Sequence, residues 1–442
     1  MTGPHPGDGK ADGVKALSLA TIFAALSGFV VIWVAQWPLD AETQLRYFQA
    51  FWGLFFASAG VIDGITQETT RAVAARTSQA RTSQAQSART RERTASLRIT
   101  EEGRAESASP WRFGGLVAGV VLAVVLVAGF FIMTSVVPPT PGLATGLLAF
   151  GLVSYVFQAV LSGILSGANL WNQYASLVAL DSGIRLLLAL VAWGLGWGLE
   201  AFLLITVIGT LSWVAVLVGS SSARAAIGAQ LDVSPGPYAR RVLQAMLASG
   251  ANAALITGYP TFLNAAFPQE DPTTAITIAG IINAVTLTRA PILVPLQRFQ
   301  SMLVVKFVEA GRGIYRALIL PVAAVLGLGA SGFVAAWLIG PWILKLAFKP
   351  ELFVDGLTLG LLTFASALTG SLMITGTAAL ALEQHGWYVA GWLTASAVAY
   401  LILFFAPLGL LPAVIVSLMA GPLAGAGVHL LGLGRARRIT RC

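Results

Sequence analysis

The sequence has few charged residues and almost no cysteine. Charged residues make up 10% of its 442 residues, against roughly 25% in ordinary soluble domains. The one cysteine, Cys442, is the last residue, so no disulfide can form within the chain. The three histidines, His5, His385 and His429, lie far apart and lack metal-ligand spacing. These absences exclude a soluble globular domain, a disulfide-stabilised secreted scaffold and a metal site of the usual kind.

The sequence also lacks the motifs that carry common enzymatic chemistry. It contains no glycine-rich phosphate-binding loop, no nucleophile triad and no pair of carboxylates suited to hydrolysis. We therefore expect a protein that is not an enzyme, uses no cofactor and binds no nucleic acid.

Long apolar runs dominate what is present. Hydrophobic residues make up 56% of the chain, and the mean hydropathy is +0.79. A helix needs roughly 20 apolar residues to cross a bilayer core of about 30 Å. The pattern predicts an all-α polytopic membrane protein with about twelve transmembrane helices, at 16–35, 47–67, 114–135, 143–165, 177–197, 201–219, 243–265, 275–296, 317–340, 357–381, 388–407 and 413–433.

The distribution of basic residues predicts the orientation. With twelve spans both termini lie on one side, and the segments on that side hold 22 Lys and Arg, whereas the opposite segments hold 3. Basic residues concentrate on the cytoplasmic side of membrane proteins. The sequence therefore predicts a multi-pass protein of the cell (inner or plasma) membrane with both termini in the cytoplasm.

Polar segments divide the predicted spans into two sets of six. A central polar linker of this kind is typical of transporters built from two parallel repeats. An Arg-rich insertion, which contains the tandem repeat RTSQA-RTSQA, is expected to form a partly helical cytosolic loop. It is interpreted either as a solvated retention loop or as a surface for anionic lipid headgroups or a partner enzyme. The predicted parts are a cytosolic tail at 1–15, a first lobe at 16–219 that includes the Arg-rich loop at 68–113, a linker at 220–242, a second lobe at 243–433 and a basic tail at 434–442.

Four acidic or basic residues, counting Asp, Glu, Lys and Arg, fall within the predicted spans: Asp63, Asp181, Arg185 and Arg289. A charge near the centre of a membrane helix costs roughly 2.5–3.5 kcal/mol on insertion scales, so each should face a partner or a hydrated cavity. Asp181 and Arg185 have i, i+4 spacing and form either a structural pair or a cavity-lining arginine tuned by the acid. Asp63 is either a proton or cation site or the counterion of an arginine on a neighbouring helix.

Arg289 has no acid within one turn and stands close to Pro291 and Pro295. Proline removes a backbone donor and kinks or breaks a helix, which would open carbonyls toward a cavity. Asn252, with Tyr259 and Pro260, belongs to a second polar span, 243–265, which is expected to be a kinked helix. We interpret Arg289 as a candidate site for an anionic group, the alternative being a salt bridge to another helix.

Three segments carry a resemblance to a known family. They are Gly64–Arg71 (GITQETTR), Gly167–Tyr174 (GANLWNQY) and Leu287–Gln300 (LTRAPILVPLQRFQ). With the twelve-span layout, they resemble polysaccharide flippases of the multidrug/oligosaccharidyl-lipid/polysaccharide (MOP) exporter superfamily. The Arg-rich insertion at 68–113 departs from the short loop usual in that family. The abundance of Arg, Ala and Gly points to a high-GC bacterium such as an actinomycete.

The resemblance implies two six-helix lobes around a central cavity. It also implies movement of a lipid-linked oligosaccharide or polysaccharide precursor to the outer leaflet by alternating access, for cell-envelope polysaccharide biosynthesis. The expected partners are a polyprenyl-diphosphate-linked glycan, membrane lipids and enzymes of envelope polysaccharide synthesis. Arg289 and Arg185 would meet the diphosphate, with Asp181, Asp63 and Asn252 as further cavity candidates. The alternatives are a cation-coupled drug or metabolite exporter of the same superfamily, a major-facilitator transporter, a membrane glycosyltransferase and a scaffold for envelope assembly.

Overall fold

A computed structural model describes residues 8–91, 107–229, 231–269, 276–310 and 313–439. Regular structure in this part of the chain is entirely helical, which confirms the all-α prediction. Eleven of the helices are long and apolar enough to cross a membrane. The twelfth expected span, 243–265, is helical but is divided between two helices, so it does not form one membrane-length helix.

The chain divides into two compact units. Unit 1 comprises Met1–Val34, Ser58–Thr134 and Pro139–Ser249. Unit 2 comprises Ala35–Ala57, Ser135–Pro138 and Gly250–Cys442. Four helices, α1, α2, α4 and α10, therefore contribute residues to both units, because a boundary falls inside each of them.

Unit 1 is built around α5, whose side chains are almost all buried over its second half. Within this unit α5 packs against α3, α6 and α7. Its small residues allow close approach: a Cβ atom added at Gly163 would lie 2.5 Å from the Cβ of Thr69 on α2. A π-helical turn joins α3 to α4, and a 3-10 turn joins α7 to α8. The helices are α1 (Asp8–Ala35), α2 (Arg46–Arg91), α3 (Pro110–Val124), α4 (Phe130–Val136), α5 (Pro141–Gly167), α6 (Trp171–Leu195), α7 (Leu199–Ile208), α8 (Ser212–Gly219), α9 (Ser221–Ala226) and α10 (Pro235–Ile256).

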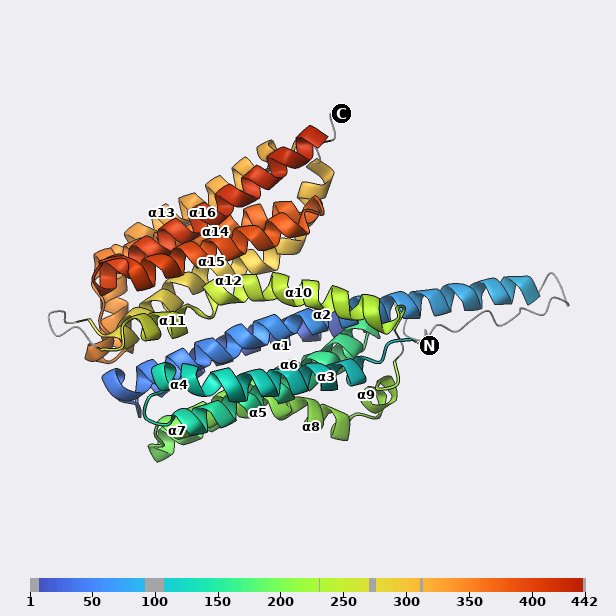
Figure 1. Cartoon of the computed structure of the whole chain (residues 1–442), viewed down its shortest axis with the longest axis horizontal. Coiled ribbons are helices and arrows are strands. Elements are labelled where there is room, and N and C mark those ends of the chain that lie inside the picture. The colour runs from blue at the N-terminus through green and yellow to red at the C-terminus, as the bar shows by residue number, and fades with distance from the viewer. Residues whose placement is uncertain (1–7, 92–106, 230, 270–275, 311–312, 440–442) are drawn as a thin grey trace. The chain divides into compact units, whose positions relative to one another are not determined.

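The central helix of unit 2 is α14, as α5 is the central helix of unit 1. α14 packs against α12, α13, α15 and α16 (Figure 1). α5 is the fourth membrane-length helix in the first half of the chain, and α14 is the third in the second half, where the expected span 243–265 is divided between α10 and α11. Like α5, α14 is rich in Gly, Ala, Ser and Thr, the residues that permit close helix packing in membranes. The helices of this unit are α11 (Tyr259–Ala266), α12 (Ile278–Ala310), α13 (Ile314–Ala347), α14 (Gly356–Ala381), α15 (His385–Phe405) and α16 (Leu410–Ile439), and the π-helical turn Ala41–Leu45 precedes α2.

Several helices run further than the sequence predicted. α2 has 46 residues and ends at Arg91, so the first part of the expected loop 68–113 continues the helix. At a rise of 1.5 Å per residue it is about 69 Å long, more than twice the bilayer core. α1 begins at Asp8 and α16 ends at Ile439, inside the expected tails at 1–15 and 434–442. Residues 92–106 lie outside the described part of the chain.

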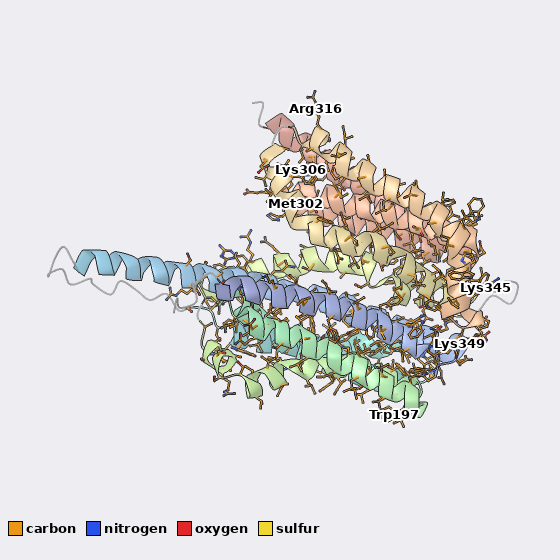
Figure 2. All side chains as sticks on the ribbon, turned by 180° about the vertical axis from the view of Figure 1, so that it is seen from behind. Trp197, Met302, Lys306, Arg316, Lys345 and Lys349 are labelled. Atoms are coloured by element: carbon orange, nitrogen blue, oxygen red, sulfur yellow. The ribbon has the colours of Figure 1, made fainter. Side chains whose placement is uncertain are left out.

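Basic residues of unit 2 lie at the two ends of its long helix α13. Figure 2 shows Lys306 and Arg316 at one end of the unit and Lys345 and Lys349 at the opposite end. The charge count that predicted the orientation assumed this separation. Which end faces the cytoplasm remains a prediction.

Candidate functional site

Arg289 is buried in unit 2, on α12, with a relative exposure of 7%. Its Nη1 atom donates a hydrogen bond to the carbonyl oxygen of Ile256 at 2.8 Å. The guanidinium carbon lies 5.3 Å from the centroid of the Tyr259 ring, within the range of a cation–π interaction. The second terminal nitrogen, Nη2, is buried and has no hydrogen-bond partner among the described residues. Arg289 therefore retains donor capacity that an anionic group would satisfy.

The carbonyl that Arg289 binds is made available by a helix break. α10 ends at Ile256 and α11 begins at Tyr259, with Pro260 at the start of α11. The last four carbonyls of a helix have no partner within it, and they carry partial negative charge. Arg289 binds one of them, and the Tyr400 hydroxyl on α15 binds another, the carbonyl of Ala254. Arg289 thus has a structural role at this helix end as well as a donor to spare.

The prolines beside Arg289 do not break its helix. α12 runs continuously from Ile278 to Ala310 and includes both Pro291 and Pro295. The exposed carbonyl that was expected at these prolines comes instead from the Gly258–Pro260 break in the preceding span. The expected break near Arg289 is therefore absent, whereas the interruption in span 243–265 falls at the proline of the span that the sequence predicted to be kinked.

Asn252 lies on α10 one turn before Ile256, in unit 2. Its side chain is half-buried. The structure therefore places Asn252 and the main-chain partner of Arg289 on the same end of α10, in one unit. Its predicted role in a cavity remains a prediction.

The other candidates lie in unit 1, where Asp63 is half-buried on α2. Its Oδ1 atom accepts a hydrogen bond from the Tyr155 hydroxyl on α5 at 2.7 Å. Within the described residues Asp63 takes part in no ion pair, so its partner is Tyr155 and not Arg185. A carboxyl group with one neutral donor can take up a proton or a cation without losing a salt bridge.

The predicted pair of Asp181 and Arg185 is confirmed. The two side chains form an ion pair on α6, and Arg185 is 4% exposed. Its Nε atom donates to the carbonyl oxygen of Thr206 on α7 at 2.9 Å. These contacts match the structural interpretation of the pair, and a role in a cavity stays a prediction.

Sequence reasoning missed Arg46, which it assigned to an outer loop. Arg46 is 2% exposed and lies in unit 2. Its Nε donates to Asn264 Oδ1 at 2.7 Å, and Nη2 donates to the carbonyl of Phe267 at 2.6 Å. A signal was present, because Arg46 directly precedes the aromatic run Tyr47–Phe56 and Asn264 was an unexplained polar residue in a predicted span.

Comparison with known sequences finds relatives in mycobacteria. The chain is 34% identical over 424 residues, 96% of its length, to "Uncharacterized protein Rv3630" of Mycobacterium tuberculosis, of which it covers 92%. It is 33% identical over 424 residues to "Uncharacterized protein Rv1510" of the same species, of which it covers 91%. The chain belongs to the family of these mycobacterial proteins. No protein-family model matches it.

Comparison with solved structures identifies the fold. The chain is similar to a multidrug resistance MATE family transporter of the MOP superfamily in its inward-facing conformation, with a TM-score of 0.67 and 16% identity over 97% of this chain and 99% of that one. It is similar to an outward-facing MATE structure with a TM-score of 0.62, 18% identity and coverage of 98% and 97%. A third neighbour is a MOP superfamily transporter from Pyrococcus furiosus, with a TM-score of 0.60, 17% identity and coverage of 96% of each chain. The protein therefore has the two-lobed fold of MATE transporters of the MOP superfamily.

Proposed function

We propose that this protein is a membrane transporter that moves a polyprenyl-diphosphate-linked oligosaccharide or polysaccharide precursor from the cytoplasmic to the outer leaflet. The glycan would serve cell-envelope polysaccharide synthesis. The enzymes that make and use the glycan would be its partners. The basic-residue bias supports a plasma-membrane location with both termini in the cytoplasm.

The buried guanidinium of Arg289 is the observation that carries this proposal. A buried cation with an unused donor is costly unless it acquires a partner. The planar guanidinium binds two phosphate oxygens at once and keeps its charge at any physiological pH. A diphosphate supplies the negative charge and several acceptors. A neutral or cationic drug does not supply the negative charge.

The fold supports alternating access as the mechanism. Structures of MATE transporters with this fold are described in inward-facing and outward-facing conformations. Two compact units, each with its own central helix, suit a transporter in which lobes move as bodies. The polar headgroup would cross through the protein while its polyprenyl chain stays in lipid.

Pocket polarity varies within the superfamily. The Pyrococcus furiosus neighbour is described by the words "reverse polarity of binding pocket suggests different function". In this chain the two basic residues within the predicted spans, Arg185 and Arg289, are both buried. Arg185 is paired with Asp181, whereas Arg289 has no ion pair among the described residues, so it is Arg289 that favours an anionic substrate over the cationic drugs that a multidrug exporter would carry.

A second candidate, a cation-coupled exporter, is favoured by one observation. Asp63 has a neutral hydrogen-bond partner and no ion pair among the described residues. A carboxyl group in that state is suited to carry the coupling proton or cation. The exporter would require Asp63 and tolerate loss of Arg289, whereas the glycan-lipid transporter requires Arg289.

Depletion of the protein in its native host tests the proposal. We expect a lipid-linked glycan to accumulate on the inner leaflet, where periodate applied to intact spheroplasts does not reach it. Complementation with Arg289→Ala should lower glycan-lipid translocation roughly 10- to 100-fold, the value of a charge-assisted hydrogen bond. Arg224→Ala is the matched control, because that arginine is exposed and binds only the carbonyls of Leu217 and Val218 among the described residues.

If Arg289→Ala were present in the membrane at the level of the parent protein and translocated the glycan lipid normally, Arg289 would not have the role assigned to it. The exporter would be favoured if depletion caused no glycan lipid to accumulate and instead raised the cellular content of a drug or metabolite.

A further inference from the structure

The N-terminal half of α10, which belongs to unit 1, carries a basic hollow. The hollow has a volume of about 440 Å³ and is lined by Gly236, Pro237, Arg240, Arg241 and Gln244. Both arginines are exposed. Arg289 belongs to the other unit, unit 2.

The two arginines of the hollow are largely uncommitted. Arg240 forms no hydrogen bond or ion pair within the described residues, and Arg241 forms only a long ion pair with Glu68, at 3.8 Å. Glu68 is already bound closely by Arg71, at 2.7 Å. Arg71 also binds Asp232 at 3.1 Å. This cluster has three arginines and two acids, namely Arg71, Arg240, Arg241, Glu68 and Asp232. One net positive charge therefore remains, and it lies at the hollow.

Exposed leucines continue the same face of the helix. Leu243 is 58% exposed and Leu247 is 55% exposed. If Arg240 is position i, the positions i+3, i+4 and i+7 are Leu243, Gln244 and Leu247. These side chains therefore form one stripe along α10. Guanidinium groups at the start of a helix and large apolar side chains over its next two turns match a lipid with a phosphate head and a hydrocarbon chain.

We propose that this stripe on α10 binds the phosphate headgroup of a membrane lipid. Arg240 and Arg241 bind the phosphate oxygens in the hollow, and the lipid chain lies along Leu243 and Leu247. A water-soluble phosphate would use the arginines but would gain nothing from the two leucines. The apolar part of the stripe therefore selects the lipid-borne phosphate. The site goes beyond the proposed transport function, since it uses other residues and needs no movement of the lobes.

Photocrosslinking in vesicles tests the site. The full chain is reconstituted in phosphatidylcholine vesicles with a phosphatidic acid that carries a diazirine, and labelled peptides are identified by mass spectrometry. We expect labelling of α10 within 239–247. Removing one arginine near a membrane surface should weaken lipid binding about fivefold. The double variant Arg240→Ala with Arg241→Ala should therefore reduce this labelling roughly 25-fold. Arg224→Ala, which removes one exposed charge already bound to main-chain carbonyls, should leave it unchanged.

Two further measurements separate the lipid from free phosphate. Replacing Leu243 and Leu247 by Gln should reduce phosphatidic acid labelling while leaving the binding of inorganic pyrophosphate to the protein unchanged. Diazirine-bearing phosphatidylcholine, whose headgroup has no net charge, should label α10 much less than phosphatidic acid does.

Equal labelling by the two lipids, or equal labelling of parent and the double arginine variant, would overturn the proposal. The proposal would also be overturned if the protein bound pyrophosphate and if replacing Leu243 and Leu247 left phosphatidic acid labelling unchanged. A failed translocation assay would not affect these results, because crosslinking requires no transport.

Discussion

The Arg185 guanidinium joins two helices of unit 1, because it pairs with Asp181 on its own helix and donates from Nε to Thr206 of α7 at 2.9 Å. The arginine is 4% exposed. A buried pair of this kind adds little net stability, but removing one partner leaves an uncompensated charge. The geometry therefore predicts a marked difference between single and double substitutions.

Asp181→Asn should destabilise the protein by about 3–5 kcal/mol, because it leaves the Arg185 charge buried without a counterion. The double variant Asp181→Leu with Arg185→Met should recover most of this loss, since it removes both charges at once. Chemical unfolding in detergent, followed by tryptophan fluorescence, measures both. Equal destabilisation by the single and double variants would mean that the ion pair is not the source of the effect.

The hydrogen bond between Asp63 and Tyr155 predicts unequal effects of removing its two ends. In Asp63→Asn the amide oxygen still accepts from the tyrosine hydroxyl, so stability should change little. In Tyr155→Phe the carboxyl group loses its donor, and stability should fall by about 1–3 kcal/mol. The same unfolding assay compares the two variants. The hydrogen bond would lose its assigned importance if Asp63→Asn proved the more damaging change.

Close contact between α2 and α10 in unit 1 makes Gly64 irreplaceable. A Cβ atom at Gly64 would lie 2.3 Å from the main-chain nitrogen of Met246. Since main chain cannot move aside cheaply, Gly64→Ala should cost at least about 1–3 kcal/mol. Gly119→Ala on α3 is the matched control, because a Cβ there meets nothing within 4 Å.

Thermal melting of the detergent-solubilised protein checks this pair of glycine variants. Gly119→Ala should melt at or slightly above the parent temperature, since alanine favours helix by about 0.5–1 kcal/mol over glycine. A Gly64→Ala protein with the parent melting temperature would contradict the close contact.

The cap of the π-helical turn Ala41–Leu45 should make stability depend on pH. Asp40 accepts hydrogen bonds from the Thr43 hydroxyl at 2.7 Å and from the main-chain N–H groups of Thr43 and Glu42. The Thr43 hydroxyl, followed by its N–H, lowers the pKa of Asp40 below its ordinary value. The stabilisation is therefore complete above the ordinary pKa of about 4 and is lost as the pH falls through the lower folded value.

Replacing Asp40 by Ala should cost about 0.5–2 kcal/mol at neutral pH, and Asp40→Asn, which still caps, should cost less. The advantage of the parent over Asp40→Asn should shrink below pH of about 4. Melting temperatures of the three proteins between neutral and acidic pH measure this. An advantage that stays constant through the acid range would show that the carboxylate does not act as the cap.

The membrane fold was readable from the sequence because hydropathy and charge act over whole helices. The Asp181–Arg185 pair was readable too, since i, i+4 spacing on one helix fixes its geometry. The partner of Asp63 was not, because Tyr155 is 92 residues away and no local rule brings α2 against α5. Nor was the burial of Arg46, because a hydropathy window treats an arginine beside an apolar run as its boundary.

The position of the helix break shows the limit of residue-type rules. Proline was expected to kink or break the helix near Arg289 and to kink the span 243–265, and α12 includes Pro291 and Pro295 without ending. The interruption falls at Gly258–Pro260, where glycine and proline act together at the start of α11. Which proline breaks a helix depends on packing that the sequence does not state.

The length of α2 has a mechanical consequence. Its 46 residues form one continuous helix that ends at Arg91. More than half of the length of α2 exceeds the thickness of the lipid core. A slight tilt of the helix within the bilayer would therefore produce a large displacement of Arg91. Any soluble component that touches that far tip would sense the state of the membrane portion without entering the lipid.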